Sequence, residues 1–355
     1  MKKFIIILLF QITILYAQSN HLIPFKKNGK IGFVDNKISV VIEPQYDAMD
    51  KYKDDTFVMF LKDKKCYVLV NKDVTKNISN YLLLGNDCYS IYQKPDTYIY
   101  NSKGKQIRAL PKLQHDHKST LEYMIVFNGS NEDIIMESGD FLFNDEKILE
   151  VFDYDKKTQT ALVRYVSKGF CLITTNGIKN KDRFIFGIRS LEDSMVFGKN
   201  TKTGESGFYD MDCNLIIKAE IKSGSDMDNW NCYPSISCGV VSFASDGEKL
   251  ILLSEGQTLH SDNWSIVDKS GEVLANKILA DYIYPFSDDV AVVKLLSGEK
   301  WIYKLIDKKG EIITDINYDE IFSSVNGYCM AKKDGIDYLI RSKDGMVYKC
   351  NDFNK

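Results

Sequence analysis

A short motif recurs along this 355-residue chain and constrains its fold more than any other feature. An apolar strand ends in Asp or another small polar residue, Gly follows within three residues, and a second apolar run comes next. Because the carboxylate binds the turn backbone and Gly accepts a positive φ, each copy predicts a β-hairpin. The clearest copies are residues 264–274 and 301–313, and an opening copy covers residues 29–47.

The spacing of these turns indicates a tandem array. Turn residues fall at positions 35, 71, 101, 136, 174, 210, 268, 307 and 342, and seven of the eight steps span 30 to 39 residues. One unit cannot bury its apolar face alone, so neighbouring units must stack. We therefore expect an all-β fold of tandem β-hairpin or meander repeats in a propeller-like closed array, with an open irregular β-solenoid as the alternative. The longest step holds a loop insertion at about residues 222–238.

Ten residues take structural roles in this interpretation. The Asp closes the turn, the Gly adopts its positive φ, and the Trp or its counterparts Ile31 and Phe170 pack between neighbouring units. Cys213 stands where one copy would carry Gly. The residues assigned to the repeat motif are Gly32, Asp35, Asp210, Trp264, Asp268, Gly271, Trp301, Asp307, Gly310 and Gly345.

Composition agrees with a strand-rich fold and excludes one class of partner. Aromatic residues make up 12% of the chain and only 6 residues are Pro, which favours strands. The net charge of −3 argues against a nucleic-acid binder, which needs a basic surface.

The first 17 residues predict export. Lys2 and Lys3 precede an apolar run, and Ala17 precedes a polar stretch, which is the layout of a secretory signal peptide. The apolar run is shorter than the ~20 residues that span a bilayer, so a retained anchor helix is the less favoured alternative. We expect cleavage after Ala17, a repeat domain over residues 18–355, no stable membrane span, and a periplasmic or extracellular location.

Cysteines and histidines supply two further candidates. The eight cysteines allow many pairings, and the closest pair in a loop-like stretch, Cys232 and Cys238, is the candidate disulfide, with two free thiols as the alternative. His115 and His117 point the same way in an extended segment and would suit a metal, but no third ligand is visible. We favour a solvated loop there and assign no metal, cofactor or catalytic residue.

The insertion is the best candidate for a binding surface. Loops that project from a rigid scaffold often carry function, and exposed aromatic rings form binding hot spots or sugar-stacking platforms. The alternative is an ordinary long loop with its Trp packed back on the core. The candidate binding residues are Asp226, Asp228, Trp230 and Tyr233.

The copies resemble WG repeats, a module of bacterial envelope and secreted proteins. The typical unit reads Gly-Lys-Trp-Gly-Phe-Ile-Asp, then Gly, then Ile-Pro-x-Tyr-Asp, and residues 28–47 match it almost throughout with Ile31 in place of Trp. Residues 286–294 look like the strand that precedes the motif. The likeness is good over residues 22–50 and 260–347 and degenerate between, and neither Trp264 nor Trp301 is followed by Gly. The resemblance implies a β-rich array and a binding role, and it implies no catalytic residues.

These observations favour a non-enzymatic exported scaffold that mediates protein–protein interaction in the cell envelope. One alternative is a carbohydrate-binding module that uses exposed aromatic side chains on an envelope glycan. A second alternative is a propeller-type hydrolase, which would need two carboxylates that converge in a pocket. The sequence leaves the partner, the disulfide pairing and the oligomeric state open.

Overall fold

The protein is all-β. The structure, a computed structural model, describes residues 21–53, 56–61, 64–69, 75–76, 81–84, 88–93, 96–100, 106–111, 124–128, 131–136, 140–166, 169–180, 184–186, 191–221, 236–246, 249–253, 259 and 261–353. Within these ranges every element is a β-strand except two 3₁₀ helices, η1 (Glu192–Ser194) and η3 (Cys350–Asp352). Among the same residues, none of the helices has the length and apolar character needed to cross a bilayer. The expected fold of tandem β-meanders is confirmed.

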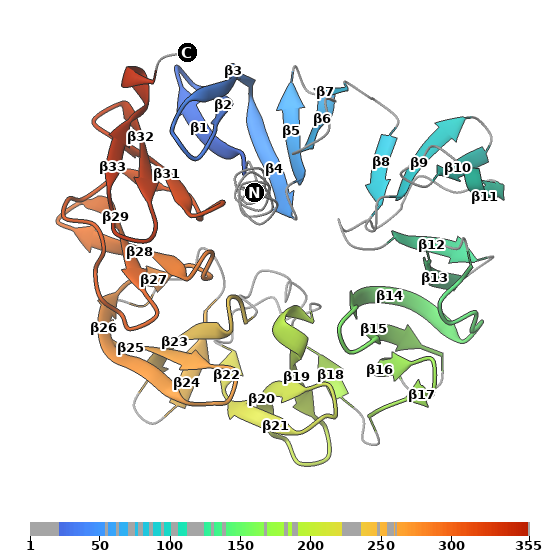
Figure 1. The fold of residues 1–355 in the computed structure, drawn as a ribbon. Helices are drawn as coiled ribbons and strands as arrows, with labels where there is room; N and C mark the ends of the chain where they lie inside the picture. The colour runs from blue at the N-terminus through green and yellow to red at the C-terminus, as the bar shows by residue number, and fades with distance from the viewer. Residues whose placement is uncertain are drawn as a thin grey trace, which may run out of the picture. The chain divides into compact units, whose positions relative to one another are not determined.

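The chain folds into two compact units, and Figure 1 labels the strands of both. The first unit comprises residues 1–79, 336–339 and 348–355, and the second comprises residues 80–335 and 340–347. The signal peptide expected at residues 1–17 and most of the insertion expected at 222–238 lie outside the described residues.

The first unit joins the two ends of the described chain. The ring of Phe25 meets the ring of Phe353 edge to face, with centroids 5.2 Å apart. Lys27 Nζ also donates a hydrogen bond of 3.2 Å to the carbonyl of Phe353. The unit holds a three-stranded and a four-stranded sheet, made of β1 (Ile23–Lys27), β2 (Lys30–Val34) and β3 (Val40–Tyr46), and of β4 (Ala48–Lys53), β5 (Thr56–Leu61), β6 (Lys64–Leu69) and β7 (Thr75–Lys76).

The second unit begins with three sheets whose strands pair mostly with their neighbours in the chain. Such meanders follow from short apolar runs joined by tight turns. The first sheet holds β8 (Tyr81–Leu84), β9 (Cys88–Gln93), β10 (Asp96–Tyr100) and β11 (Gln106–Pro111), and the second holds β12 (Met124–Asn128) and β13 (Asn131–Ile135). The third holds β14 (Ile148–Asp155), β15 (Thr160–Tyr165), β16 (Gly169–Thr174), β17 (Gly177–Ile178), β18 (Phe184–Phe186), β19 (Met195–Asn200), β20 (Ser206–Asp210) and β21 (Leu215–Lys218).

Three more sheets follow along the chain, and the last of them has strands that contribute residues to both units. The pairing of β22 with β24 is parallel, and those of β23 with β25, β28 with β29 and β30 with β31 are antiparallel. The sheets are β22 (Glu220–Ile221), β23 (Val240–Asp246), β24 (Lys249–Leu252), β25 (Ser261–Asp268) and β26 (Val273–Ala280); β27 (Tyr282–Ile283), β28 (Val290–Ser297) and β29 (Lys300–Asp307); and β30 (Glu320–Ile321), β31 (Tyr328–Lys333), β32 (Ile336–Arg341) and β33 (Val347–Lys349).

Apolar side chains fill the space between consecutive sheets of the second unit. Val290 to Val293 of β28 are all buried, so this half of the strand is covered on both faces. Trp264 of β25 packs with Tyr282, Ile283 and Phe286 of the following segment in one cluster. We call this group the Trp264 cluster; its other buried members are Val240, Ala244, Leu253, Ile266, Ala280, Ala291, Val293 and Ile306.

Candidate functional site

The motif aspartates form the same turn in every described copy with Asp at the marker position. The Oδ1 atom of each accepts backbone N–H groups from the residues at i+2 and i+4, over 2.8–2.9 Å. The N–H at i+3 donates to the carbonyl of the Asp itself. These carboxylates hold turn backbone, as a turn Asp is expected to do. The four residues are Asp35, Asp210, Asp268 and Asp307.

The residue at i+3 of each turn has a positive φ whether or not it is Gly. Gly271 and Gly310 have φ of 90° and 76°, and Ile38 and Cys213 have φ of 62° and 66° at the same position. Cys213 therefore replaces Gly without changing the turn, and its burial raises the pKa of the thiol to about 11. A side chain in this left-handed region costs roughly 1–2 kcal/mol.

Three motif glycines also lie against the preceding repeat. A Cβ on Gly310 would stand 2.8 Å from the side chain of Ile278 on β26, and one on Gly271 would stand 3.1 Å from the carbonyl of Ile216 on β21. Gly345 faces the carbonyl of Ile313 in the same way. The turn of one repeat thus packs on the outer strand or segment of the repeat before it.

Gly32 has a different role from the turn glycines. A Cβ at this position would stand 2.5 Å from the carbonyl of Ile42 on β3, where the pairing of β2 with β3 shifts its register. Gly207 lies against β21 in the same way, beside another register shift. Gly at this position of the motif lets two strands approach across a bulge.

The two motif tryptophans lie in different surroundings. Trp264 is 1% exposed, and its Nε1 donates a hydrogen bond of 2.9 Å to the carbonyl of Ala280. It packs between two sheets, as expected. Trp301 is 39% exposed, so the expected packing between units is wrong for this residue. The reason is position, because Tyr303 takes the place four residues before the turn Asp that Trp264 has in its own repeat.

Trp301 belongs to an exposed group on the β28–β29 hairpin. Leu296 pairs with it across the strands and is 46% exposed. Lys294 lies on the same face, with Nζ 4.0 Å from the centroid of the indole ring. The register runs unbroken from Val290 and Asp307 to the tip at Ser297 and Lys300, so the hairpin is a stiff support. We call Lys294, Leu296 and Trp301 the hairpin platform.

A second series of turns precedes the strands β19, β23, β28 and β31. Each contains two consecutive residues of positive φ, and we call these pairs the entry turns. Sequence reasoning missed them and assigned residues 286–289 to a strand, although β28 begins only at Val290. The dipeptide Asn326–Gly327 could have predicted them from the sequence, because Asn–Gly favours a type I′ turn, in which both central residues have a positive φ. The four pairs are Asp193–Ser194, Cys238–Gly239, Asp288–Asp289 and Asn326–Gly327.

Carboxylates connect the entry turns of consecutive repeats. Asp193 Oδ2 accepts the N–H of Gly239 over 2.6 Å. Asp288 Oδ2 accepts the N–H of Gly327 over 2.8 Å and the hydroxyl of Ser324 over 2.8 Å. We call such a bond a carboxylate clasp.

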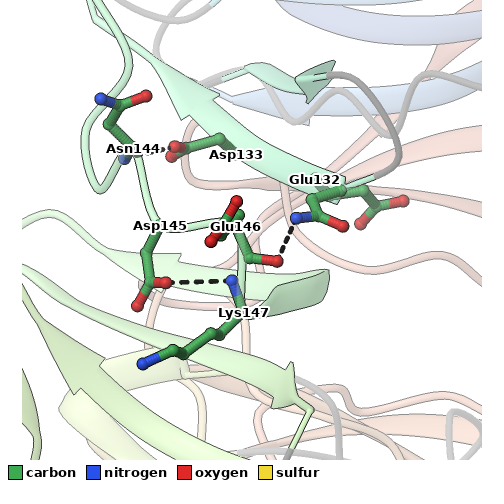
Figure 2. A pocket seen from close by; sticks show the side chains of 7 residues that line it. Glu132, Asp133, Asn144, Asp145, Glu146 and Lys147 are labelled. Atoms are coloured by element: carbon green, nitrogen blue, oxygen red, sulfur yellow. Dashed lines mark hydrogen bonds between the residues drawn. The ribbon is translucent and has the colours of Figure 1, made fainter.

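An acidic pocket of about 570 Å³ lies between the β12–β13 hairpin and the loop before β14. Figure 2 shows the carboxylate of Asp133 turned toward Asn144. Asp133 accepts N–H groups from Ile134, Phe143 and Asn144 over 2.6–3.2 Å, and burial raises the pKa of its carboxyl group. The lining residues are Asn131, Glu132, Asp133, Asn144, Asp145, Glu146 and Lys147.

The carboxylates of this pocket hold the loop in place. Besides Asp133, buried Glu132 accepts the N–H of Val151 over 2.8 Å, and Asp145 accepts the hydroxyl of Tyr165 over 3.0 Å. A glycosidase needs carboxyl groups that reach its substrate, and Asp133 is instead enclosed by backbone donors. Among the described residues that line it, none has an aromatic ring on which a sugar would stack. The pocket therefore favours neither the hydrolase nor the carbohydrate alternative.

Several residues predicted to form sites lie outside the described part of the chain. Cys238 is a half-buried free thiol, but its predicted partner Cys232 is not described, so the disulfide stays a prediction. In the described ranges, no group of three or more His, Cys, Asp or Glu side chains is arranged to hold a metal ion. The binding residues Asp226, Asp228, Trp230 and Tyr233, and the pair His115 and His117, are outside these ranges.

Comparison with known proteins identifies the repeat. The family described as WG containing repeat matches residues 31–66, 264–301 and 305–335. These three segments are similar to WG repeats, and two of the matches begin at the motif positions Ile31 and Trp264. No curated protein matches the chain significantly.

Solved structures share a general likeness at low identity. A eukaryotic initiation factor has a TM-score of 0.49 at 9% identity, over 94% of this chain and 96% of its own. Porphyromonas gingivalis dipeptidyl peptidase 4 has a TM-score of 0.43 at 8% identity, over 93% and 58%. The Neurospora crassa Pan2 WD40 domain has a TM-score of 0.29 at 13% identity, over 74% and 87%. Likeness at this level carries no argument about function.

Proposed function

We propose that the chain is a non-enzymatic, exported repeat scaffold that binds a protein partner in the cell envelope. The observation that carries this proposal is the hairpin platform. An exposed Trp beside an exposed Leu on a stiff hairpin has the composition of a binding hot spot, where aromatic side chains supply most of the affinity. If Trp301 were only a solvent-exposed strand residue, neither the exposed side chain of Leu296 beside it nor the rigid β28–β29 hairpin would be needed.

The WG repeats and the N-terminal sequence support the other parts of the proposal. In the described copies, the motif Asp residues hold turn backbone, and Gly271, Gly310 and Gly345 lie against the preceding repeat. The turn residues of the motif therefore support a scaffold role, and binding falls to exposed side chains such as Trp301 that take no part in the turns or the core. Export rests on the signal-peptide layout of residues 1–17.

Affinity capture from the native envelope with matched variants tests the binding surface. We expect a partner to be recovered by the unchanged protein and by Val166→Ala, and to be lost with Trp301→Ala. Val166 is the control because it is apolar and 61% exposed but lies in the turn after β15, away from the β28–β29 hairpin in the chain. Equal recovery by both variants would overturn the assignment of the hairpin platform.

A carbohydrate-binding role is the second candidate, and exposed Trp301 favours it as well. Indole rings stack on sugars, and Lys294 would supply a hydrogen-bond donor beside the ring. Binding on a glycan array that is lost in Trp301→Ala would favour this candidate over a protein partner. Turnover of an envelope substrate by the purified protein would contradict the non-enzymatic assignment.

A further inference from the structure

Among the four described entry turns, carboxylate clasps connect the first to the second and the third to the fourth, and the second is not connected to the third. Asp193 binds the turn at Gly239, and Asp288 binds the turn at Gly327. Between them, the first residue of the entry turn is Cys238. A thiol is a weak acceptor, and Cys238 has no hydrogen bond to the turn at Asp288 and Asp289. The junction between β23 and β28 therefore lacks the clasp.

Two buried hydroxyl groups at the same junction have no partner. Ser237 and Ser242 line a narrow crevice against Ile283 to Phe286, and the Oγ of each is buried without a hydrogen bond. Ser242 is only 7% exposed, and the crevice is too narrow for a water molecule. Buried hydroxyls without partners favour conformations that let water reach them.

The next junction along the chain shows what the complete arrangement looks like. Ser287 occupies the place of Ser237 in its entry turn, and its hydroxyl donates a hydrogen bond of 2.6 Å to the carbonyl of Ser324. The hydroxyl of Ser324 in turn donates to Asp288 and lies 2.6 Å from the hydroxyl of Ser342. The hydroxyl of Ser237, which is unsatisfied, thus has a hydrogen-bonded counterpart in Ser287, and the position that corresponds to Ser242 is the apolar Val292.

Apolar packing holds the rest of the unclasped junction. The ring of Trp264 meets that of Tyr282 edge to face, with centroids 6.1 Å apart, whereas the cluster members Val240, Ile283 and Phe286 lie at the turn end. Trp264 lies four residues along β25 from Asp268, which pairs with Val240 beside the entry turn. At ~3.3 Å per residue the indole is roughly 13 Å from that end of the sheet. The two sheets are therefore held together at Trp264, and they lack a carboxylate clasp at the entry turn.

We propose that the turn end of this junction opens, so that Ser237 to Ser242 separate from Ile283 to Phe286 while the contact of Trp264 with Tyr282 keeps the sheets together. Opening hydrates the hydroxyls of Ser237 and Ser242 and exposes the thiol of Cys238. A single residue, Cys in place of Asp, sets this behaviour. The entry turn at Cys238 lies at the end of the insertion expected at about residues 222–238.

Hydrogen exchange read by mass spectrometry tests the proposal on the full chain. Peptides that cover residues 237–243 and 283–290 should exchange faster than peptides that cover 324–330. Cys238→Asp adds a carboxylate that can reach the next turn, and it should slow exchange at the first junction about tenfold, as a charge-assisted hydrogen bond would. Asp already occupies this conformation at Asp288, where φ is 49°, so the variant is compatible with the turn.

Cys238→Ala is the matched control, because it removes the thiol without adding an acceptor. Its exchange should remain as fast as that of the unchanged protein. Equal exchange at the two junctions in the unchanged protein, or equal exchange in Cys238→Asp and Cys238→Ala, would overturn the proposal.

Thiol labelling of reduced, unmutated protein gives a second readout. Cys238 should be labelled before global unfolding and faster than Cys329, whose thiol is fully buried with a pKa raised to about 11. Labelling of both thiols only when the protein unfolds would also overturn the proposal.

Discussion

Trp264 and Trp301 occupy two consecutive copies of the turn motif, and the comparison separates a residue that is part of the core from one that lies exposed on the surface. Both lie on a strand that runs into an Asp–x–x–Gly turn. Trp264 is four residues before its Asp, is buried, and hydrogen-bonds the carbonyl of Ala280. Trp301 is six residues before its Asp, next to the hairpin tip, and is exposed.

The difference teaches that residue type alone does not decide whether a motif side chain is buried, since one Trp is in the core and the other is exposed. The turn Asp fixes the end of the strand, and Trp264, four positions earlier, lies where the next sheet covers it, whereas Tyr303 at the same distance from Asp307 is half-buried. Trp301 is six positions before its Asp, so it points to the same face of its strand as a residue four positions before it. Trp301, however, lies near the tip of the β28–β29 hairpin. Four variants test this comparison.

The largest effect is expected for Trp264→Ala. Removing a fully buried indole leaves a cavity in the Trp264 cluster and an unsatisfied carbonyl at Ala280. We expect the free energy of unfolding to fall by about 3–5 kcal/mol, measured by urea denaturation. A loss below about 1 kcal/mol would show that Trp264 does not join the two sheets.

Gly310→Ala should rank second. The new Cβ meets Ile278 of the preceding repeat, and Gly310 has a φ of 76°. We expect a loss of about 1–3 kcal/mol in the same assay. Gly298→Ala is the control, since φ there is 63° but nothing lies within 4 Å. If both variants lose the same stability, the turn does not pack on the preceding repeat.

Asp268→Asn should have a smaller effect that depends on pH. The hydroxyl of Ser270 and several turn N–H groups lower the pKa of Asp268. Its stabilising contribution is therefore present above the ordinary Asp pKa of ~3.9 and is lost as the pH falls through the lowered value. Thermal unfolding at neutral pH should show a loss under about 1 kcal/mol, because the turn is exposed.

The difference between Asp268→Asn and the unchanged protein should shrink in acid. Asp307→Asn in the Trp301 repeat is the matched variant, and Lys309 stands there in place of Ser270. A difference that grows on acidification would contradict the stabilising role of the ionised Asp268.

Trp301→Ala should change stability least. Its ring is exposed and lies outside the Trp264 cluster, so we expect a change within about 0.5 kcal/mol by urea denaturation. A loss as large as that of Trp264→Ala would mean that Trp301 is a core residue, and the comparison would fail.

The fold could be predicted from the sequence because its main signals are local. An Asp that binds backbone two and four residues ahead and a residue of positive φ at i+3 are encoded within five residues. Even Cys213 was recognised at the Gly position by its spacing. The acidic pocket was not predicted, because the contacts of Asp133 with Phe143 and Asn144 cross a loop without periodicity.

The junctions between repeats could not be predicted, because they depend on contacts between distant residues. Asp288 binds Gly327, which is 39 residues away, and Asp193 binds Gly239, which is 46 residues away. The exposure of Trp301 also depends on where the adjacent sheet ends, and the motif pattern does not contain this information. The assignment of Asp226, Asp228, Trp230 and Tyr233 to a binding loop stays a prediction.

Closure of the array also stays a prediction. The packing of Phe25 on Phe353 within the first unit shows that the ends of the described chain meet there. A closed propeller-like array needs such a contact, whereas an open solenoid does not. If the array is closed, Phe353→Ala should lower the free energy of unfolding, whereas truncating a frayed terminus would leave it nearly unchanged. An unchanged unfolding midpoint in Phe353→Ala would favour the open form.

Acrylamide quenching of two variants with one tryptophan each tests the central comparison most directly. Trp230→Phe combined with Trp301→Phe retains Trp264, and Trp230→Phe combined with Trp264→Phe retains Trp301. We expect blue-shifted emission and weak quenching from Trp264, and red-shifted emission with several-fold stronger quenching from Trp301. Equal quenching of the two indoles would contradict the assignment of one to the core and the other to a binding surface.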